Sequence, residues 1–97
     1  MAEPNVQVGQ IWADNDPRCE GRTIRVEAIG HSARMGCDVA ECTILTNSDQ
    51  AQAELDRRPP RDWRTPRDMR GKRTTIAIRR FRPISSGYRL VEGGTDG

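Results

Sequence analysis

Basic side chains are concentrated in one stretch of the chain, residues 57–82. That stretch has ten arginines and Lys72 against Asp62 and Asp68, a net charge of +9, whereas four arginines against ten acidic residues give residues 1–56 a net charge of −6. The net charge of the whole chain, +2, conceals this asymmetry. We therefore expect a polyanionic partner. Arginine suits this role because its planar guanidinium binds phosphate or carboxylate groups through paired hydrogen bonds.

The spacing of these arginines matches a nucleic-acid backbone. From residue 57 to residue 73 they recur every one to three positions, so that an extended segment can follow successive phosphates. Trp63 lies between Arg61 and Arg64 and offers an aromatic face for stacking on an unpaired base. Arg79 and Arg82 add positive charge beside a later strand. The predicted residues for contacting nucleic acid or another partner are Arg57, Arg58, Arg61, Trp63, Arg64, Arg67, Arg70, Lys72, Arg73, Arg79 and Arg82.

Other interpretations of the charge pattern stay open. The basic stretch also suits an acidic surface on a host protein, which this chain would dock on and modulate. A third possibility is a solvated loop whose Trp63 folds back over the domain. The acidic half contains a cluster that can bind a basic partner, form a solvated surface, or pair with the basic half of the same chain or of a second copy. Its residues are Asp14, Asp16, Glu20 and Glu27.

The sequence contains little that would support catalysis or metal binding. It has a single histidine, His31, and lacks a Gly-x-Ser-x-Gly elbow, a His-Glu-x-x-His motif and a phosphate-binding glycine loop, so we predict no enzyme activity. Cys19, Cys37 and Cys42 with His31 form no Cys-x2-Cys knuckle. In one strand Cys37 and Cys42 would point to opposite faces, and Cys42 is expected in the core. We therefore predict no metal and no cofactor.

Length and composition indicate one small domain over residues 1–97. Only 34% of the residues are hydrophobic, and no apolar run approaches the ~18 residues of a membrane span. The first ten residues lack a signal-peptide pattern. Three cysteines, an odd number, imply no disulfide framework, and together these features predict a cytoplasmic protein. Residues 48–72 are predicted to be a mobile Arg-rich insertion, and residues 93–97 a flexible tail.

Alternation of apolar and polar side chains predicts five strands, over residues 6–12, 22–29, 38–45, 74–80 and 87–91. Gly9 is expected to mark a bulge in the first of these strands. Residues 30–36 form a connection longer than a tight hairpin. Residues 49–58 favour a short helix, with Ser48 or Asp49 as its N-cap and Pro59 ending it.

Five short strands predict an all-β fold, a small SH3-like barrel in which closure protects both edge strands. The alternative is an oligonucleotide-binding barrel, in which residues 49–58 would be the helix between strands three and four. A turn of about one helical turn at residues 80–83, before a short last strand, favours the SH3-like arrangement. In the second strand, Ala28 should share the inner face with Ile24 and Val26. The predicted core consists of Val8, Ile11, Ile24, Val26, Ile44, Ile76, Ile78 and Leu90.

Four segments carry a resemblance to known proteins: VGQIWADNDPR (residues 8–18), GRTIRV (21–26), RRFRP (79–83) and GYRLV (87–91). In these segments the chain resembles small uncharacterised proteins of actinobacteria and their bacteriophages. The Arg-rich residues 48–70 lie outside the resemblance. The resemblance implies a compact protein of actinobacterial or phage origin, and it implies no particular mechanism.

Overall fold

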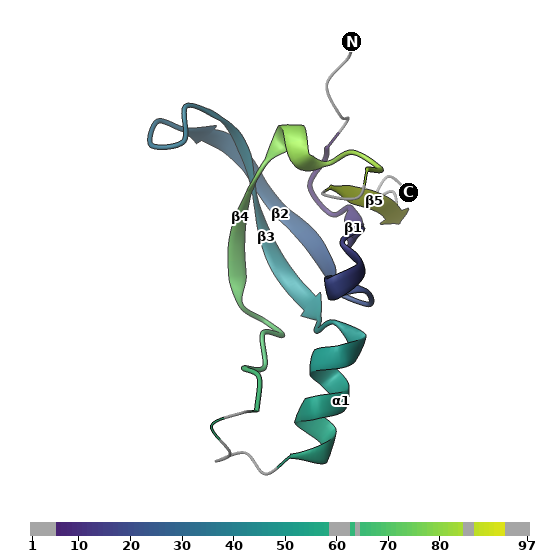
Figure 1. Ribbon diagram of the computed structural model, residues 1–97. Helices are drawn as coiled ribbons and strands as arrows, with labels where there is room; N and C mark the ends of the chain where they lie inside the picture. The colour runs from purple at the N-terminus through teal and green to yellow at the C-terminus, as the bar shows by residue number, and fades with distance from the viewer. Residues whose placement is uncertain (1–5, 59–62, 64, 85–86, 93–97) are drawn as a thin grey trace.

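The computed structural model describes residues 6–58, 63, 65–84 and 87–92. Five strands, one α-helix and two 3-10 turns follow one another along these residues (Figure 1). They are β1 (Ile11–Asp14), η1 (Pro17–Cys19), β2 (Thr23–Ser32), β3 (Cys37–Thr46), α1 (Asp49–Arg57), β4 (Arg73–Ala77), η2 (Ile78–Arg80) and β5 (Tyr88–Glu92). None of the helices in the described residues is long and apolar enough to cross a membrane. The predicted tail at 93–97 lies outside the described residues.

The five strands form one antiparallel sheet in the order β4-β3-β2-β1-β5. The prediction of five strands is therefore confirmed. β4 and β5 are at the two ends of this order, and the sheet is not closed. β2 and β3 have ten residues each and form a hairpin that extends well past the other strands (Figure 1).

The β2–β3 hairpin differs from its predicted form in two ways. A register shift between Val26 and Ala28 interrupts the alternation, so the prediction that Ala28 faces the core is wrong, and its side chain is exposed. The strands also run to Ser32 and restart at Cys37, which makes the connection a tight turn rather than a long one. Gly36 allows this turn because its φ of 70° lies in the left-handed region.

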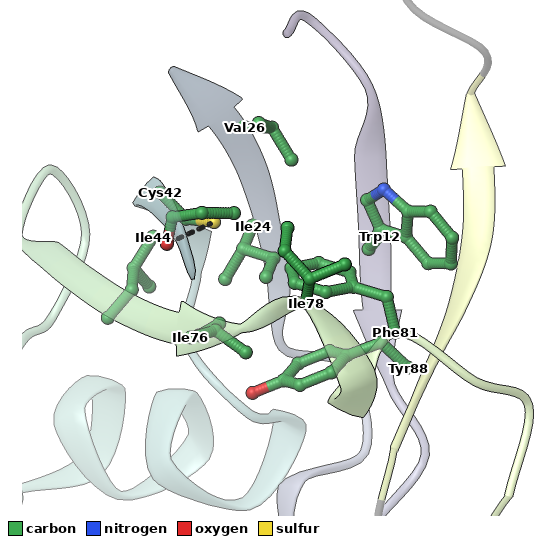
Figure 2. Close-up of a cluster of buried hydrophobic side chains, with 10 residues drawn as sticks. Trp12, Ile24, Val26, Cys42, Ile44, Ile76, Ile78, Phe81 and Tyr88 are labelled. Carbon is green, nitrogen blue, oxygen red and sulfur yellow. Dashed lines mark hydrogen bonds between the residues drawn. The ribbon is translucent and has the colours of Figure 1, made fainter. Parts of the chain in front are cut away.

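The core lies on one face of the sheet (Figure 2). Ile24, Val26, Ile44, Ile76 and Ile78 are all buried, which confirms these members of the predicted core. Three aromatic rings that the prediction omitted complete it. Phe81 packs edge-on against Trp12 with ring centroids 5.0 Å apart, and it stacks on Tyr88 at 5.4 Å. Buried Cys42 lies beside them, as predicted.

Three other predicted core residues are not buried. Val8 is 54% exposed and Leu90 48% exposed, while Ile11 is only half-buried. The expected first strand at 6–12 is wrong at its start, because Gly9 (φ 93°) makes a turn and β1 begins only at Ile11. Leu90 lies on β5, one of the two edge strands of the sheet, and on this strand Tyr88 rather than Leu90 packs against the core.

The segment before β5 also differs from its predicted form. β4 ends at Ala77 rather than at residue 80, and the single helical turn, η2, comes about two residues earlier than expected. Ile78 remains buried from this turn. The Phe81 amide donates to the Ile78 carbonyl at 3.0 Å, which closes the turn and directs the Phe81 ring inward.

Candidate nucleic-acid interface

The Arg-rich residues lie on a projection that we call the arm: α1, Trp63 and the return leg, residues 65–72. α1 extends away from the sheet, and the return leg runs back beside it into β4 (Figure 1). The helix forms where predicted because Ser48 caps it, its Oγ accepting a hydrogen bond from the Ala51 amide at 3.2 Å. The residues predicted to be one mobile insertion therefore include a capped helix.

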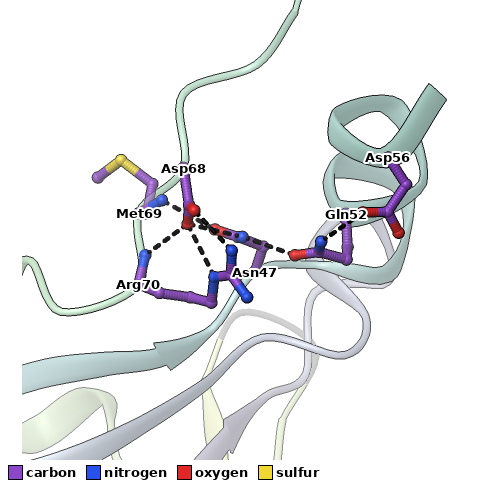
Figure 3. A network of polar contacts seen from close by, with 6 residues as sticks. All are labelled: Asn47, Gln52, Asp56, Asp68, Met69 and Arg70. Carbon is purple, nitrogen blue, oxygen red and sulfur yellow. Dashed lines mark hydrogen bonds and ion pairs between the residues drawn. The ribbon is translucent and has the colours of Figure 1, made fainter. Parts of the chain in front are cut away.

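A polar network joins the two sides of the arm at its root (Figure 3). Asn47, only 6% exposed, follows β3 directly. Its Nδ2 donates to Gln52 Oε1 on α1 at 2.9 Å and to Asp68 Oδ1 on the return leg at 3.0 Å. Its Oδ1 accepts a hydrogen bond from the Met69 amide at 2.9 Å. One buried amide side chain thus connects the sheet, the helix and the return leg.

Asp68 extends this network to Arg70. The Asp68 carboxylate accepts hydrogen bonds from Arg70 Nε at 3.0 Å and from its terminal nitrogen at 2.7 Å. Hydrogen bonds from Arg70, and then from Asn47, hold the pKa of Asp68 well below its usual range. The carboxylate is therefore ionised at neutral pH and offsets the charge of Arg70.

The end of α1 has a second set of ion pairs. Glu54 forms ion pairs with both Arg57 and Arg58, which follow it by three and four residues. Three of the predicted arm arginines (Arg57, Arg58 and Arg70) are therefore partly neutralised within the chain. Arg67 is exposed and makes no ion pair in the described part of the chain.

Trp63 is the most exposed large apolar residue of those described, at 90%. The alternative in which its ring folds back over the domain is therefore wrong. Arg61 and Arg64, predicted to flank it in the interface, lie outside the described residues, as does Pro59.

The remaining predicted residues follow β4 away from the arm. Lys72 and Arg73 are exposed where the return leg enters the strand, and Arg79 and Arg82 are exposed at η2, at its other end. A five-residue strand at ~3.3 Å per residue separates the two pairs by about 16 Å. The predicted set thus forms a strip along the outer strand β4, with the arm at one end.

The outer face of the sheet beside this strip is electrically balanced. Arg25 pairs with Glu27 at 2.8 Å, and the Thr75 hydroxyl donates to Glu41. A hydrogen bond from Arg25, one from Thr43 and the charge of Arg73 lower the pKa of Glu27. This face offers less net charge to an anionic partner than the arm does.

The three cysteines and the histidine do not come together in one group in the described part of the chain. Burial raises the pKa of the Cys42 thiol to about 12, and its Sγ donates weakly to the Ala40 carbonyl. All three cysteines are free thiols, and no three described His, Cys, Asp or Glu residues are grouped to hold a metal ion. His31 pairs with Asp38 at 3.0 Å on the exposed hairpin. Together with Cys37 and Arg79 this pair lines an open groove of about 320 Å³.

Sequence reasoning missed Asn47 and Asp68, the residues that hold the arm in place. Their 21-residue separation leaves no periodic signal, although a polar Asn-Ser pair between a strand and a helix indicates a capped boundary. The arm therefore presents an exposed tryptophan and several arginines, and hydrogen bonds of Asn47 hold it to the sheet. Comparison of the chain with protein-family models, curated proteins and solved structures finds no match.

Proposed function

We propose that the protein binds single-stranded nucleic acid through the arm, with Trp63 stacking on a base and the arginines contacting phosphates. The observation that carries this proposal is the 90% exposure of Trp63 beside the Arg-rich return leg. Burying a large apolar side chain stabilises a fold by about 1.5–3 kcal/mol, and because Trp63 is exposed its ring does not contribute this stabilisation to the domain. A stacked base would cover the ring, and every base has a face for stacking.

The charges that remain uncompensated support the same partner. In the described part of the chain, Arg67, Lys72 and Arg82 are exposed and make no ion pair. They lie along the arm and the outer strand, where a flexible polyanion can follow them. Phosphate contacts of this kind give affinity without base specificity.

A protein partner is the second candidate function. In this case the module docks on an acidic surface of a host protein and modulates that protein. Three apolar side chains favour it, since Ile84, Leu90 and Val91 are each about half exposed on or near the outermost strand β5. They lie outside the Arg-rich strip, so a protein partner would cover both regions.

We also infer that the five strands have the SH3-like arrangement, although their sheet is not closed into a barrel, and that the protein acts in the cytoplasm. The meander β1 to β4, with β5 returning to β1 after a 3-10 turn, supports the SH3-like arrangement. The three free thiols suit a reducing compartment. The proposed phage origin is compatible with a host nucleic acid or a host protein as partner.

Fluorescence anisotropy with a labelled oligothymidine tests the proposed function at two salt concentrations. Trp63→Ala should weaken binding to the single strand by about 1–3 kcal/mol, and binding to a duplex much less. Trp63→Phe keeps an aromatic face and should retain most of the affinity. Lys72→Ala should reduce the slope of log affinity against log salt by about 0.7.

Arg34→Ala is the matched control for charge, because Arg34 is exposed in the turn between β2 and β3, at the end of the molecule opposite α1 (Figure 1). It should leave the salt slope unchanged. No binding by the parent protein at low salt would refute the nucleic-acid proposal. Capture of a protein from nuclease-treated lysate, lost in Lys72→Ala, would then favour the second candidate.

A further inference from the structure

A small cavity lies where the arm joins the sheet. Its volume is about 110 Å³, and its lining comes from η1, the end of β3, the start of α1 and the return leg. Two of the lining residues are arginines, Arg22 and Arg67. Liquid water occupies about 30 Å³ per molecule, so the cavity has the volume of roughly four waters, which suits a group of phosphate size.

Arg22 has a buried donor with no partner. Its Nε is out of contact with solvent and makes no hydrogen bond within the described part of the chain. A buried polar group without a partner is destabilising, more so when it carries charge, and native proteins seldom leave one unexplained. Because Arg22 also lines the cavity, we take its unpaired donor as a sign that the cavity accommodates an acceptor.

Nearby acidic groups do not supply that acceptor. Asp14 is buried and lies close enough to Tyr88 that both it and Arg22 influence the pKa of that hydroxyl, which burial raises. The Asp14 carboxylate instead accepts a hydrogen bond from the Asp16 amide at 3.0 Å. No ion pair joins Asp14 to Arg22 among the described residues.

We propose that this cavity is a subsite for one phosphate group, held between the guanidinium groups of Arg22 and Arg67. The inference rests on the proposed function, in which that phosphate belongs to the bound strand. Arginine pairs with phosphate through two parallel hydrogen bonds, and such charge-assisted bonds are strong when water is excluded. Buried Ile44 in the lining limits the access of water on one side of the cavity.

The positive charge comes from the two arginines and not from the amino end of α1. Ser48 already caps that helix, and the Asp49 amide donates to the Glu20 carbonyl at 2.6 Å. Asn47 and Met69 line the cavity and are hydrogen-bonded to each other. The network at the root of the arm therefore fixes the cavity wall that Asn47 and Met69 form, next to Arg67 in the chain.

Nuclear magnetic resonance of the parent protein tests the subsite directly. The Nε–Hε resonance of Arg22, assigned by its absence in Arg22→Gln, should shift in a saturable way on titration with inorganic phosphate. Potassium chloride of equal ionic strength should leave it unchanged. An Arg22 resonance that responds neither to phosphate nor to an oligothymidine would overturn the inference, whatever the fate of the variants.

Anisotropy with the same oligonucleotide then identifies the source of the phosphate. Arg22→Gln should weaken binding about tenfold or more, whereas Arg25→Gln, on the paired outer face of β2, should bind as the parent does. Arg22→Lys keeps the positive charge but loses the paired N–H donors of the guanidinium, so its affinity for the oligonucleotide should lie between those of Arg22→Gln and the parent. If Arg22→Gln fails to fold, Arg22→Lys takes its place in the comparison.

The outcomes separate the two proposals. Oligonucleotide binding that Arg22→Gln and Arg22→Lys both leave intact overturns the subsite and leaves the proposed function standing. A saturable Arg22 shift with inorganic phosphate, without any oligonucleotide binding, supports the phosphate site and overturns nucleic acid as its source.

Discussion

Replacing Asn47 by alanine should release the arm from the sheet. The substitution removes three hydrogen bonds, those to Gln52 and Asp68 and the one from the Met69 amide. A hydrogen bond contributes about 0.5–1.5 kcal/mol net, so three of them bracket the loss at about 1.5–4.5 kcal/mol.

The exposure of the partners narrows this range. Asp68 and Met69 are exposed, and Gln52 is half-buried, so water can replace much of what Asn47 supplied. We therefore expect a loss near the lower end, about 2 kcal/mol in the free energy of unfolding. Domains of this kind have only about 5–15 kcal/mol in total, which makes the effect a large one.

Two measurements check this expectation. Urea unfolding of Asn47→Ala gives the global free energy, and hydrogen exchange gives the local protection of the Met69 amide, which should fall at least about tenfold. Asn15→Ala is the matched control, since Asn15 also makes two side-chain hydrogen bonds but lies at an exposed site. It should cost less than about 1 kcal/mol. If Asn47→Ala matches the parent in both measurements, the network does not anchor the arm.

Three further predictions concern the core and the backbone. Ile76→Asp should abolish the cooperative unfolding transition in circular dichroism, because Ile76 is 3% exposed and an unpaired charge there exceeds what a small domain tolerates. Gly87→Ala should be strongly destabilising in thermal melts, since a Cβ at Gly87 would overlap the Arg82 carbonyl oxygen. Cys42, with a thiol pKa raised to about 12, should resist alkylation at pH 9 in the native protein and react in denaturant. That raised pKa also means that the unfolded state loses its proton first, so the stability from Cys42 is complete below its unfolded pKa, about 8.5, and declines above it.

Each of these predictions has a control in the same chain. Ile84→Asp changes an exposed isoleucine and should remain folded. Gly36→Ala meets no atom within 4 Å and should cost about 1 kcal/mol, from its positive φ alone. Cys42→Ala should remove the decline of stability above pH 8.5. A folded Ile76→Asp, a Gly87→Ala no worse than Gly36→Ala, or rapid native alkylation of Cys42 would each contradict the corresponding assignment.

Local features of the sequence predicted the elements well. Alternation located β2 and β3 and placed Ile24, Val26 and Ile44 in the core, because a half-buried strand must show one apolar face. Ser48 predicted the start of α1 because a cap depends only on the next three residues. Both signals are complete within a few positions of the chain.

Register depended on contacts that the sequence does not display. The shift between Val26 and Ala28 exposes a residue that simple alternation buries, and the turn at Gly9 delays β1 until Ile11. The glycine marked an irregularity at position 9 in the sequence, whereas the shift after Val26 is decided by what the neighbouring strand offers and leaves no sign within β2 itself. On β5 simple alternation also fails, since Tyr88 is buried and Leu90, two residues later, is exposed.

The candidate site divides in the same way. The charge of residues 57–82 and the presence of Trp63 are properties of the sequence itself, and they predict an anionic partner without any structure. Only the tertiary structure shows that Trp63 is exposed, that Asn47 holds the return leg and that Arg22 faces a cavity. The unpaired Nε of Arg22 is a consequence of packing between segments far apart in the chain, and that packing arises only when the chain folds.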